Sequence, residues 1–308
     1  MSVPNTKNRT IGDAPRARPQ TPSAKLPQFI LDWAGLAPFF LFALAFLFIP
    51  SFSIFVRSFQ ANDGSFTLNN IVALFTQRDI INAYKTSLQI SAITAVGGAL
   101  FGFLLAQAVI LGGLPRNLRT FLLTFSGVAS NFAGVPLAFA FVATMGNAGL
   151  VTGWIEAIFD LDLRQMGFSI YRMTGLSIVY MYFQFPLMVL IMAPALDGLR
   201  REWREACENL GGSTLHYWRY VALPILLPSL LGTTILLFGN AFGAYATAYA
   251  FSGSFINLVT ILIGAQIQGD VLYNPGLGNA LALGMIVIMS ITMLGYTIMQ
   301  RRAARWVR

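Results

Sequence analysis

The stretch EACENLGGSTLHYWRYVALPILLP, residues 205–228, interrupts a chain that is otherwise mostly apolar. It opens with helix-forming residues, breaks at the glycine pair Gly211-Gly212, and returns to apolar sequence at Pro224 and Pro228. Four apolar stretches long enough to cross a membrane precede it, and two follow it. We therefore expect the stretch to form a loop between the fourth and fifth of six membrane spans.

The composition of the chain is that of a membrane protein. Of its 308 residues, 56% are hydrophobic and 10% are charged, whereas soluble domains carry roughly 25% charged residues. The formal net charge is +8, but the basic residues lie at the ends of apolar segments and form no continuous face, so we expect no nucleic-acid partner. A single cysteine, Cys207, and a single histidine, His216, exclude an internal disulfide and a metal site built from these residues.

Six segments are long and apolar enough to span a bilayer, which takes about 20 residues. They are residues 33–56, 83–111, 121–145, 174–196, 220–251 and 276–300. A further apolar run at 256–267 is too short to span, and we expect a helix at the membrane surface or packed inside the protein. The predicted fold class is an all-α polytopic membrane protein, with a disordered tail at 1–28 and one transmembrane domain at 29–308.

The Lys and Arg residues predict the orientation of these spans. Most of the 20 such residues fall in the tail, in the 112–119 and 198–219 loops, and at the C-terminus. Because short cytoplasmic loops carry an excess of Lys and Arg, we place all four regions in the cytoplasm. Both termini then lie on the same side of the membrane, as an even number of spans requires.

The spans contain few ionisable side chains. Intramembrane charges persist mainly for function, as in proton relays, so we expect any transport to be driven from outside the bilayer; the alternative is a scaffold that transports nothing. Polar side chains within the spans either line an aqueous path or form interhelical hydrogen bonds, and the sequence leaves both open. The candidates for a path are Asn131, Gln184, Asn240, Tyr245 and Tyr249, with Thr247 beside them.

Glycine and proline mark the points where we expect close packing and bending. The GxxxG spacing, which lets helix backbones approach closely, occurs at 98–102 and at 239–243. Kinks are expected at three prolines inside the spans, where a backbone donor is lost: Pro136, Pro186 and Pro194.

The loop itself predicts two short helices with a sharp turn between them. Gly211 and Gly212 permit a turn that a residue with a β-carbon resists, and Ser213 can cap the following helix. That helix, over 214–220, is rich in aromatic side chains. Aromatic residues supply rigid contact area at interfaces, which indicates a docking element; a helix lying on the membrane surface is the alternative.

In order and spacing, this stretch resembles the EAA loop of the membrane subunits of bacterial ATP-binding-cassette (ABC) importers. The family pattern is Glu-Ala-Ala, three residues, Gly, and further on an apolar-Leu-Pro run. The matching positions are Glu205, Ala206, Gly211, Leu223 and Pro224, and Cys207 stands where the family has its second alanine. The resemblance extends over roughly residues 30–300 and implies the six-helix, MetI-like fold of type I importer permeases.

The resemblance also implies roles for the loop at 198–222. Gly211 would make the bend, and residues 212–220 would form a coupling helix seated in a groove of a cytoplasmic ATPase subunit. Glu205 would make an ionic contact that holds the loop or the ATPase. The coupling residues carried over by the match are Glu205, Ala206, Gly211, Gly212, Ser213, Thr214, Leu215, His216, Tyr217, Leu223 and Pro224.

The partners implied by the resemblance are two ATPase subunits, a second permease subunit that we expect to be a homologue, and a solute-binding protein, at a bacterial inner membrane. ATP and Mg²⁺ would bind in the ATPase subunits, because this chain has no GxxxxGK[ST] phosphate-binding loop. We expect the chain to bind no cofactor or metal and to be no enzyme itself.

A second stretch bears on the solute. Residues 240–250, NAFGAYATAYA, followed by NPGLGNALA at 274–282, resemble the spermidine/putrescine permease branch. The implied solute is a polyamine, with phosphonate, ferric iron and thiamine as alternatives from overlapping branches. Two rival classes are a secondary transporter, which would need intramembrane charges, and a membrane-embedded enzyme, which would need clustered catalytic side chains at the membrane face.

Overall fold

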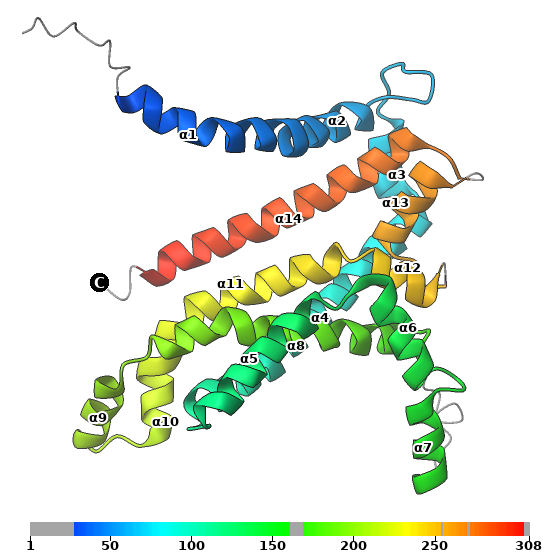
Figure 1. Cartoon of the computed structure of the whole chain (residues 1–308). Coiled ribbons are helices and arrows are strands. Elements are labelled where there is room, and N and C mark those ends of the chain that lie inside the picture. Colours follow the sequence, from blue (N-terminus) through cyan, green and yellow to red (C-terminus); the bar gives the residue numbers. More distant parts are fainter. Residues whose placement is uncertain (1–27, 161–168, 254, 270–271, 305–308) are drawn as a thin grey trace, which may run out of the picture. The chain divides into compact units, whose positions relative to one another are not determined.

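A computed structural model of the chain describes residues 28–160, 169–253, 255–269 and 272–304 (Figure 1). The tail predicted at 1–28 lies outside the described residues except for Gln28, the first residue of helix α1 (Gln28–Ala43). The chain divides into two parts, Met1–Ser51 and Phe52–Arg308. In the first part, α1 is followed without interruption by a π-helical turn, η1 (Leu44–Phe48).

The next helix, α2 (Ile49–Ser58), crosses the boundary between the two parts, and the second part is almost entirely helical over its described residues. Its remaining elements are α3 (Asn69–Thr76), α4 (Arg78–Leu111), α5 (Arg116–Asn131), α6 (Gly134–Met145), α7 (Leu150–Phe159), α8 (Met173–Asp197), α9 (Arg201–Asn209), α10 (Thr214–Tyr217), the π-helical turn η2 (Trp218–Ala222), α11 (Leu223–Phe242), α12 (Ala246–Ser252), α13 (Val259–Gln268) and α14 (Pro275–Ala304).

The predicted count of six membrane spans is confirmed over the described part of the chain. By length and composition, the candidate spans are Gly35–Ser58, Arg78–Leu111, Gly134–Phe159, Met173–Asp197, Thr214–Phe242 and Pro275–Ile298. The apolar run at 256–267 is α13, a ten-residue helix that is too short to span. Four of the six spans begin and end within a few residues of the predicted limits.

The third predicted span, 121–145, is not one helix, and this prediction was wrong. Helix α5 ends at Asn131, and α6 begins at Gly134 with a φ of 74°. The kink expected at Pro136 is instead a helix start, because Pro136 is the third residue of α6, where a missing N–H leaves no hydrogen bond unmade. The candidate third span consequently runs through α6 and α7.

The fifth predicted span, 220–251, was also wrong in its limits. Its helix begins earlier, at Thr214, and α11 ends at Phe242. Three residues then separate α11 from α12. Within that gap the carbonyl of Ala244 accepts a hydrogen bond from the Tyr180 hydroxyl at 2.9 Å. The predicted span 220–251 therefore contains a break after Phe242, and a hydrogen bond from α8 stabilises the chain there.

Helices α4 and α8 pack against each other along a seam of small residues. A β-carbon on Gly98 would lie 2.7 Å from Cβ of Gln184, and one on Gly102 would lie 2.6 Å from Cβ of Met188. No side chain fits at such distances, so both glycines allow the backbones to meet. The GxxxG spacing at 98–102 is thus a helix–helix contact, and it makes α4 and α8 a tightly packed pair.

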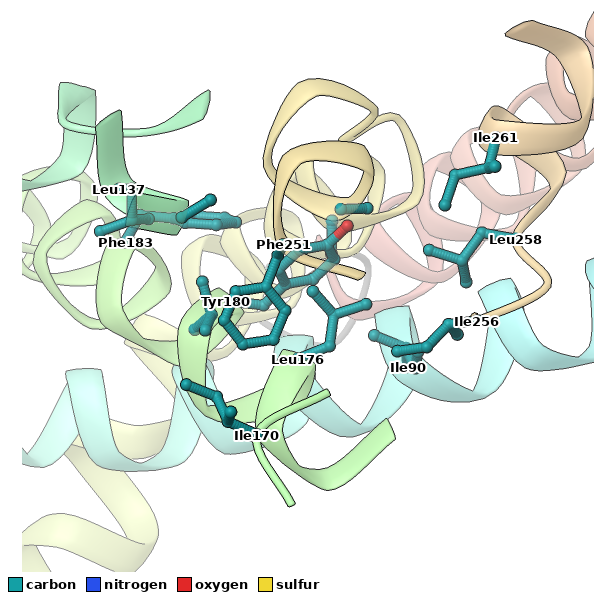
Figure 2. Packing of buried hydrophobic residues seen from close by; sticks show 14 residues of the cluster. Ile90, Leu137, Ile170, Leu176, Tyr180, Phe183, Phe251, Ile256, Leu258 and Ile261 are labelled. Atoms are coloured by element: carbon teal, nitrogen blue, oxygen red, sulfur yellow. The ribbon is translucent and has the colours of Figure 1, made fainter. Parts of the chain in front are cut away.

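The second part has its polar loop and its helix breaks at opposite ends of the long helices. In Figure 1, α9 and α10 lie at one end of α8 and α11, and α6 and α12 lie at the other. At the end near α12, the buried ring of Tyr180 packs in an apolar cluster with Leu176 and Phe251, as Figure 2 shows. The two regions that matter for function are therefore separated by the length of the spans.

Candidate functional site: the polar loop and the paired helix breaks

The polar loop begins with α9, which is held by local charge pairs. The Glu205 carboxylate lies 3.1 Å from Arg201, and Glu208 lies 2.9 Å from Arg204, both at i,i+4 spacing and both exposed. Such pairs contribute about 0.2–0.5 kcal/mol each to an isolated helix. Both pairs lie within α9 and do not connect it to another element. The Glu205 side chain is exposed and remains accessible to another protein.

The turn after α9 is a Schellman motif built by the glycine pair. Gly211 adopts a φ of 80°, its N–H donates to the Glu208 carbonyl, and the Gly212 N–H donates to the Cys207 carbonyl, both at 2.9 Å. Only glycine adopts the left-handed conformation without strain. A β-carbon on Gly212 would lie 2.6 Å from the Cys207 sulfur. The turn therefore requires glycine at Gly211 because of its φ angle and at Gly212 because of the close contact with Cys207.

Ser213 caps the next helix, as the sequence predicts. Its hydroxyl oxygen accepts a hydrogen bond from the His216 N–H at 3.4 Å and lies 2.7 Å from His216 Nδ1. A side-chain acceptor at this position satisfies a backbone donor that the helix leaves free. The cap therefore fixes where the helix starts, directly after the glycine turn.

The predicted short helix over 214–220 is not a separate element. Helix α10 continues through η2 into α11, so that Thr214–Phe242 is one helical run of 29 residues. In the π-helical turn, the Leu223 N–H donates to the carbonyl of Trp218, five residues back. This wider turn lets the helix pass Pro224, which has no N–H to donate.

Large apolar side chains on both sides of the glycine turn differ in exposure. Leu210, which follows α9, and Leu215 of α10 expose 89% and 74% of their surface, whereas Tyr217 of α10 exposes 6%. Trp218 packs its ring edge-to-face against Phe103 of α4, with the ring centroids 6.4 Å apart. One face of the loop is thus held on the spans, and the other presents large apolar side chains.

A cavity of about 1060 Å³ lies between the loop and the end of α4. Its lining includes Leu104, Ala108, Arg200, Glu205, Thr214 and Trp218. Nearby, the Arg119 guanidinium forms an ion pair with Asp197, which ties the start of α5 to the end of α8. Sequence reasoning missed this pair, since the two residues are far apart in the chain.

Of the predicted path residues, four lie at or beside the two helix breaks. Asn131 is the exposed last residue of α5, and Asn240 is exposed near the end of α11. Tyr245 and Tyr249 stack with ring centroids 5.4 Å apart where α12 begins. The breaks also contact each other, because the Gly134 N–H donates to the Thr247 hydroxyl at 2.7 Å.

Gln184 is the exception among the predicted path residues. Its side chain is fully buried between helices and hydrogen-bonds to the Leu237 carbonyl of α11 at 3.2 Å. It therefore matches the interhelical alternative that the sequence left open. Sequence reasoning missed its neighbour Tyr180, one turn earlier on α8, although a second hydrogen-bonding side chain at i−4 in an apolar span was a usable signal.

Six candidate spans, a loop with an exposed apolar face and helix breaks lined by polar side chains define a multi-span membrane transport subunit. Residues 98–305, more than half of the chain, match the family described as "Binding-protein-dependent transport system inner membrane component". The chain belongs to this family, and it is a permease subunit of the ABC-importer class in the inner membrane.

Relatives of known description differ in solute. The chain is 25% identical over 274 residues to a probable sulfate permease, cysT, of Nephroselmis olivacea, covering 86% of this chain and 88% of the relative. It is 26% identical to the molybdenum permease ModB of Mycobacterium tuberculosis, covering 68% and 78%. It is 23% identical to the spermidine/putrescine permease PotB of Haemophilus influenzae, covering 85% and 91%.

One solved structure with a similar fold comes from a bacterial ABC transporter involved in the import of the acidic polysaccharide alginate. The TM-score is 0.68 at 17% identity, and the match covers 89% of this chain and 96% of that one. Together with the family match, this confirms the predicted MetI-like permease fold.

Proposed function

We propose that this permease subunit couples ATP hydrolysis in partner subunits to the passage of a small charged solute. The observation that carries the proposal is the unbroken helical run Thr214–Phe242. It begins in the polar loop and ends at the break after Phe242. A rigid helix of 29 residues is about 44 Å long at 1.5 Å per residue, so a push on α10 moves the far end of the span.

The exposed face of the loop is the contact surface for an ATPase subunit in this proposal. Leu210 and Leu215 would enter a groove of that subunit, with the Glu205 carboxylate making an ionic contact beside them. The Lys and Arg excess in the loop and at the C-terminus supports a cytoplasmic position for both. ATP and Mg²⁺ belong to two such ATPase subunits.

The cycle that follows is alternating access by rigid-body motion. A solute-binding protein delivers solute at the side opposite the loop, where the breaks after Asn131 and Phe242 place exposed polar side chains. A second, homologous permease subunit completes the path. Closure of the ATPase subunits on ATP moves α10 and α11 together, and hydrolysis resets them.

The test compares two glutamates on the same helix. Glu205→Lys should remove the ATPase subunits from the detergent-solubilised assembly and lower uptake into proteoliposomes by at least about tenfold, because a charge reversal at a contact is repulsive. Glu208→Lys is the matched control, since Glu208 is also exposed and also paired with an arginine. Unchanged uptake and co-purification in Glu205→Lys would contradict the coupling role.

For the solute, the proposal remains a polyamine, supported by the resemblance of residues 240–250 to the spermidine/putrescine branch and by the similarity to PotB. Sulfate or molybdate is the second candidate, supported by the descriptions of the cysT and ModB relatives. In both cases the solute-binding protein supplies most of the selectivity, because the described spans offer few charges.

The solute-binding protein that delivers solute to this permease decides between the candidates. We expect spermidine or putrescine to raise its thermal unfolding temperature in a concentration-dependent manner, as binding to the native state requires. Sulfate, molybdate, a phosphonate, ferric iron and thiamine serve as parallel samples. A shift with sulfate or molybdate alone would replace the polyamine assignment and leave the permease role intact.

A further inference from the structure

A groove of about 810 Å³ lies between helices α3, α4 and α14, at the end of the spans opposite the polar loop (Figure 1). Apolar side chains from all three helices line it, such as Leu74, Leu88 and Val287. Tyr84 of α4, which also lines it, donates a hydrogen bond from its hydroxyl to the Leu281 carbonyl of α14. The groove is therefore mostly apolar, and the hydroxyl of Tyr84 is already paired.

Two further polar side chains, Lys85 and Gln89, line the groove among the apolar ones. They lie four residues apart on α4, so both project from the same side of the helix. Both are exposed, and neither has an ion pair or hydrogen bond with any residue of the described chain. An apolar pocket with a few convergent polar groups is typical of a ligand site. The pattern fits a ligand that has a polar end and an apolar body.

The position of Lys85 along α4 places its charge at the edge of the membrane. Helix α4 has 34 residues and is about 51 Å long at 1.5 Å per residue, whereas the hydrocarbon core is roughly 30 Å thick. A helix centred on the bilayer therefore extends about 10 Å beyond the core at each end. Lys85 lies about 10 Å along the axis from Arg78, the first residue of α4. Its ammonium group is consequently at the depth where the lipid phosphates begin.

A charge at this depth needs a partner, because an ionisable side chain within a span is costly unless it is paired. The first span, Gly35–Ser58, contains no acidic residue and carries Arg57. Neither this span nor the same span of an identical copy could neutralise Lys85. A lipid phosphate supplies the missing negative charge, and basic residues at the membrane surface attract anionic lipids. The acyl chains of such a lipid match the apolar walls of the groove.

We propose that the groove binds an anionic phospholipid, with the phosphate on Lys85 and an acyl chain along Leu74, Leu88 and Val287. The Lys85 ammonium donates a charge-assisted hydrogen bond to a phosphate oxygen. Gln89, one turn deeper in the membrane, donates its amide to an ester carbonyl below the phosphate. The lipid contacts α3, α4 and α14 together. This site lies apart from the polar loop and does not depend on the coupling role.

The first test compares two basic residues on the same helix. The full assembly, solubilised in detergent, is titrated with phosphatidylglycerol or phosphatidylethanolamine, and the bound lipid is measured by native mass spectrometry. Lys85→Gln should lower the affinity for phosphatidylglycerol about fivefold, as expected for one basic side chain near an anionic lipid, with a smaller effect on phosphatidylethanolamine. Lys85→Arg should retain the affinity. Arg78→Gln is the matched control, because Arg78 is also exposed but does not line the groove.

The second test fills the apolar part of the groove and leaves Lys85 in place. Val287→Trp should weaken the binding of both lipids at least about fivefold, because the indole ring occupies the space of an acyl chain. Ile286→Trp is the control, since Ile286 is the exposed neighbour on α14 and lies outside the groove. Glycerol phosphate, which carries the charge without acyl chains, should not compete with phosphatidylglycerol. Lys85→Gln should unfold at the wild-type temperature without added lipid, because its side chain is exposed.

Four results would overturn the proposal. An equal loss of affinity in Arg78→Gln and Lys85→Gln would indicate nonspecific attraction to the protein surface. Unchanged affinity in Lys85→Gln would mean that the lipid binds elsewhere. Competition by glycerol phosphate would indicate a site for a free anion. Release of the second permease subunit by Lys85→Gln, with lipid affinity unchanged, would mean that protein covers the groove. The coupling role is tested separately by Glu205→Lys, which leaves the groove intact.

Discussion

The polar loop and the paired helix breaks are two interruptions of the same spans, and they are built in opposite ways. The hydrogen bonds that form the turn of the loop are local: the Gly211 N–H bonds to Glu208, three residues back, and the Ser213 cap bonds to His216, three residues on. The breaks depend on long-range contacts. Gly134 bonds to Thr247 across 113 residues of sequence, and Tyr180 bonds to Ala244 across 64.

This difference has consequences for mutation. A change in the loop alters a turn that carries little of the packed core, so it should affect coupling more than stability. A change at the breaks removes a contact between distant helices, so it should affect stability as well as transport. Three substitutions test this contrast, in order of decreasing expected effect on uptake.

Gly211→Val has the largest expected effect. No atom would obstruct the new β-carbon, so its cost arises from the φ of 80°, where a non-glycine residue loses about 1–2 kcal/mol and a β-branched one more. We expect the spans to insert normally while uptake falls by at least about tenfold and ATP hydrolysis becomes uncoupled from it.

Gly211→Asn is the control, because asparagine tolerates the left-handed conformation better than other residues with a side chain. It should retain most of the uptake. Normal coupling in Gly211→Val would show that the bend at this position is not needed, and the loop would no longer differ from the breaks in the way described.

Thr247→Val tests the contact between the two breaks. The isosteric valine removes the acceptor for the Gly134 N–H, and an unsatisfied donor at a largely buried contact costs about 1–3 kcal/mol. We expect a lower thermal unfolding temperature and an intermediate loss of uptake, with ATPase co-purification unchanged. Thr247→Ser, which keeps the hydroxyl, should behave as the wild type; equal stability of the two variants would contradict the role of this bond.

Ser213→Ala has the smallest expected effect. Loss of an N-cap costs about 1 kcal/mol of helix stability, but the helix that Ser213 caps continues into α11 and is stabilised there. We expect uptake to fall less than about threefold, with no change in the unfolding temperature of the spans. Ser213→Asp retains a capping oxygen and should restore wild-type uptake. A loss as large as that of Gly211→Val would mean that the cap, rather than the glycine turn, positions the loop.

The sequence predicted well wherever the cause of the structure is local. Runs of apolar residues predicted six spans, and the glycine pair with Ser213 predicted the turn and cap of the loop. The sequence did not predict the limits of helices that are interrupted within an apolar run, as at residues 132–133. The hydropathy of such a run is the same whether the helix is continuous or interrupted. Pro136 was read as a kink because its place in the first turn of a new helix was not visible.

For the candidate site, the sequence identified polar residues in apolar spans, but it did not predict which other residues they contact or whether they are buried. Asn131, Tyr245 and Tyr249 were chosen as polar residues in apolar spans, and the structure gathers them at two breaks. Gln184 was chosen by the same rule and is buried. Which side of a helix faces a neighbour depends on packing, and in spans that are apolar all round, periodicity carries no such information.

The sequence by itself determined the class of the protein, the count of six spans, the glycine turn with its Ser213 cap and the resemblance to importer permeases, because these depend on composition and on residues close together in the chain. Only the tertiary structure decided that the loop helix and the fifth span form one continuous helix, that the predicted spans 121–145 and 220–251 contain breaks that contact each other, and that Gln184 bonds to α11. Those features depend on hydrogen bonds and close packing between helices that are distant in the chain, and no local pattern encodes them.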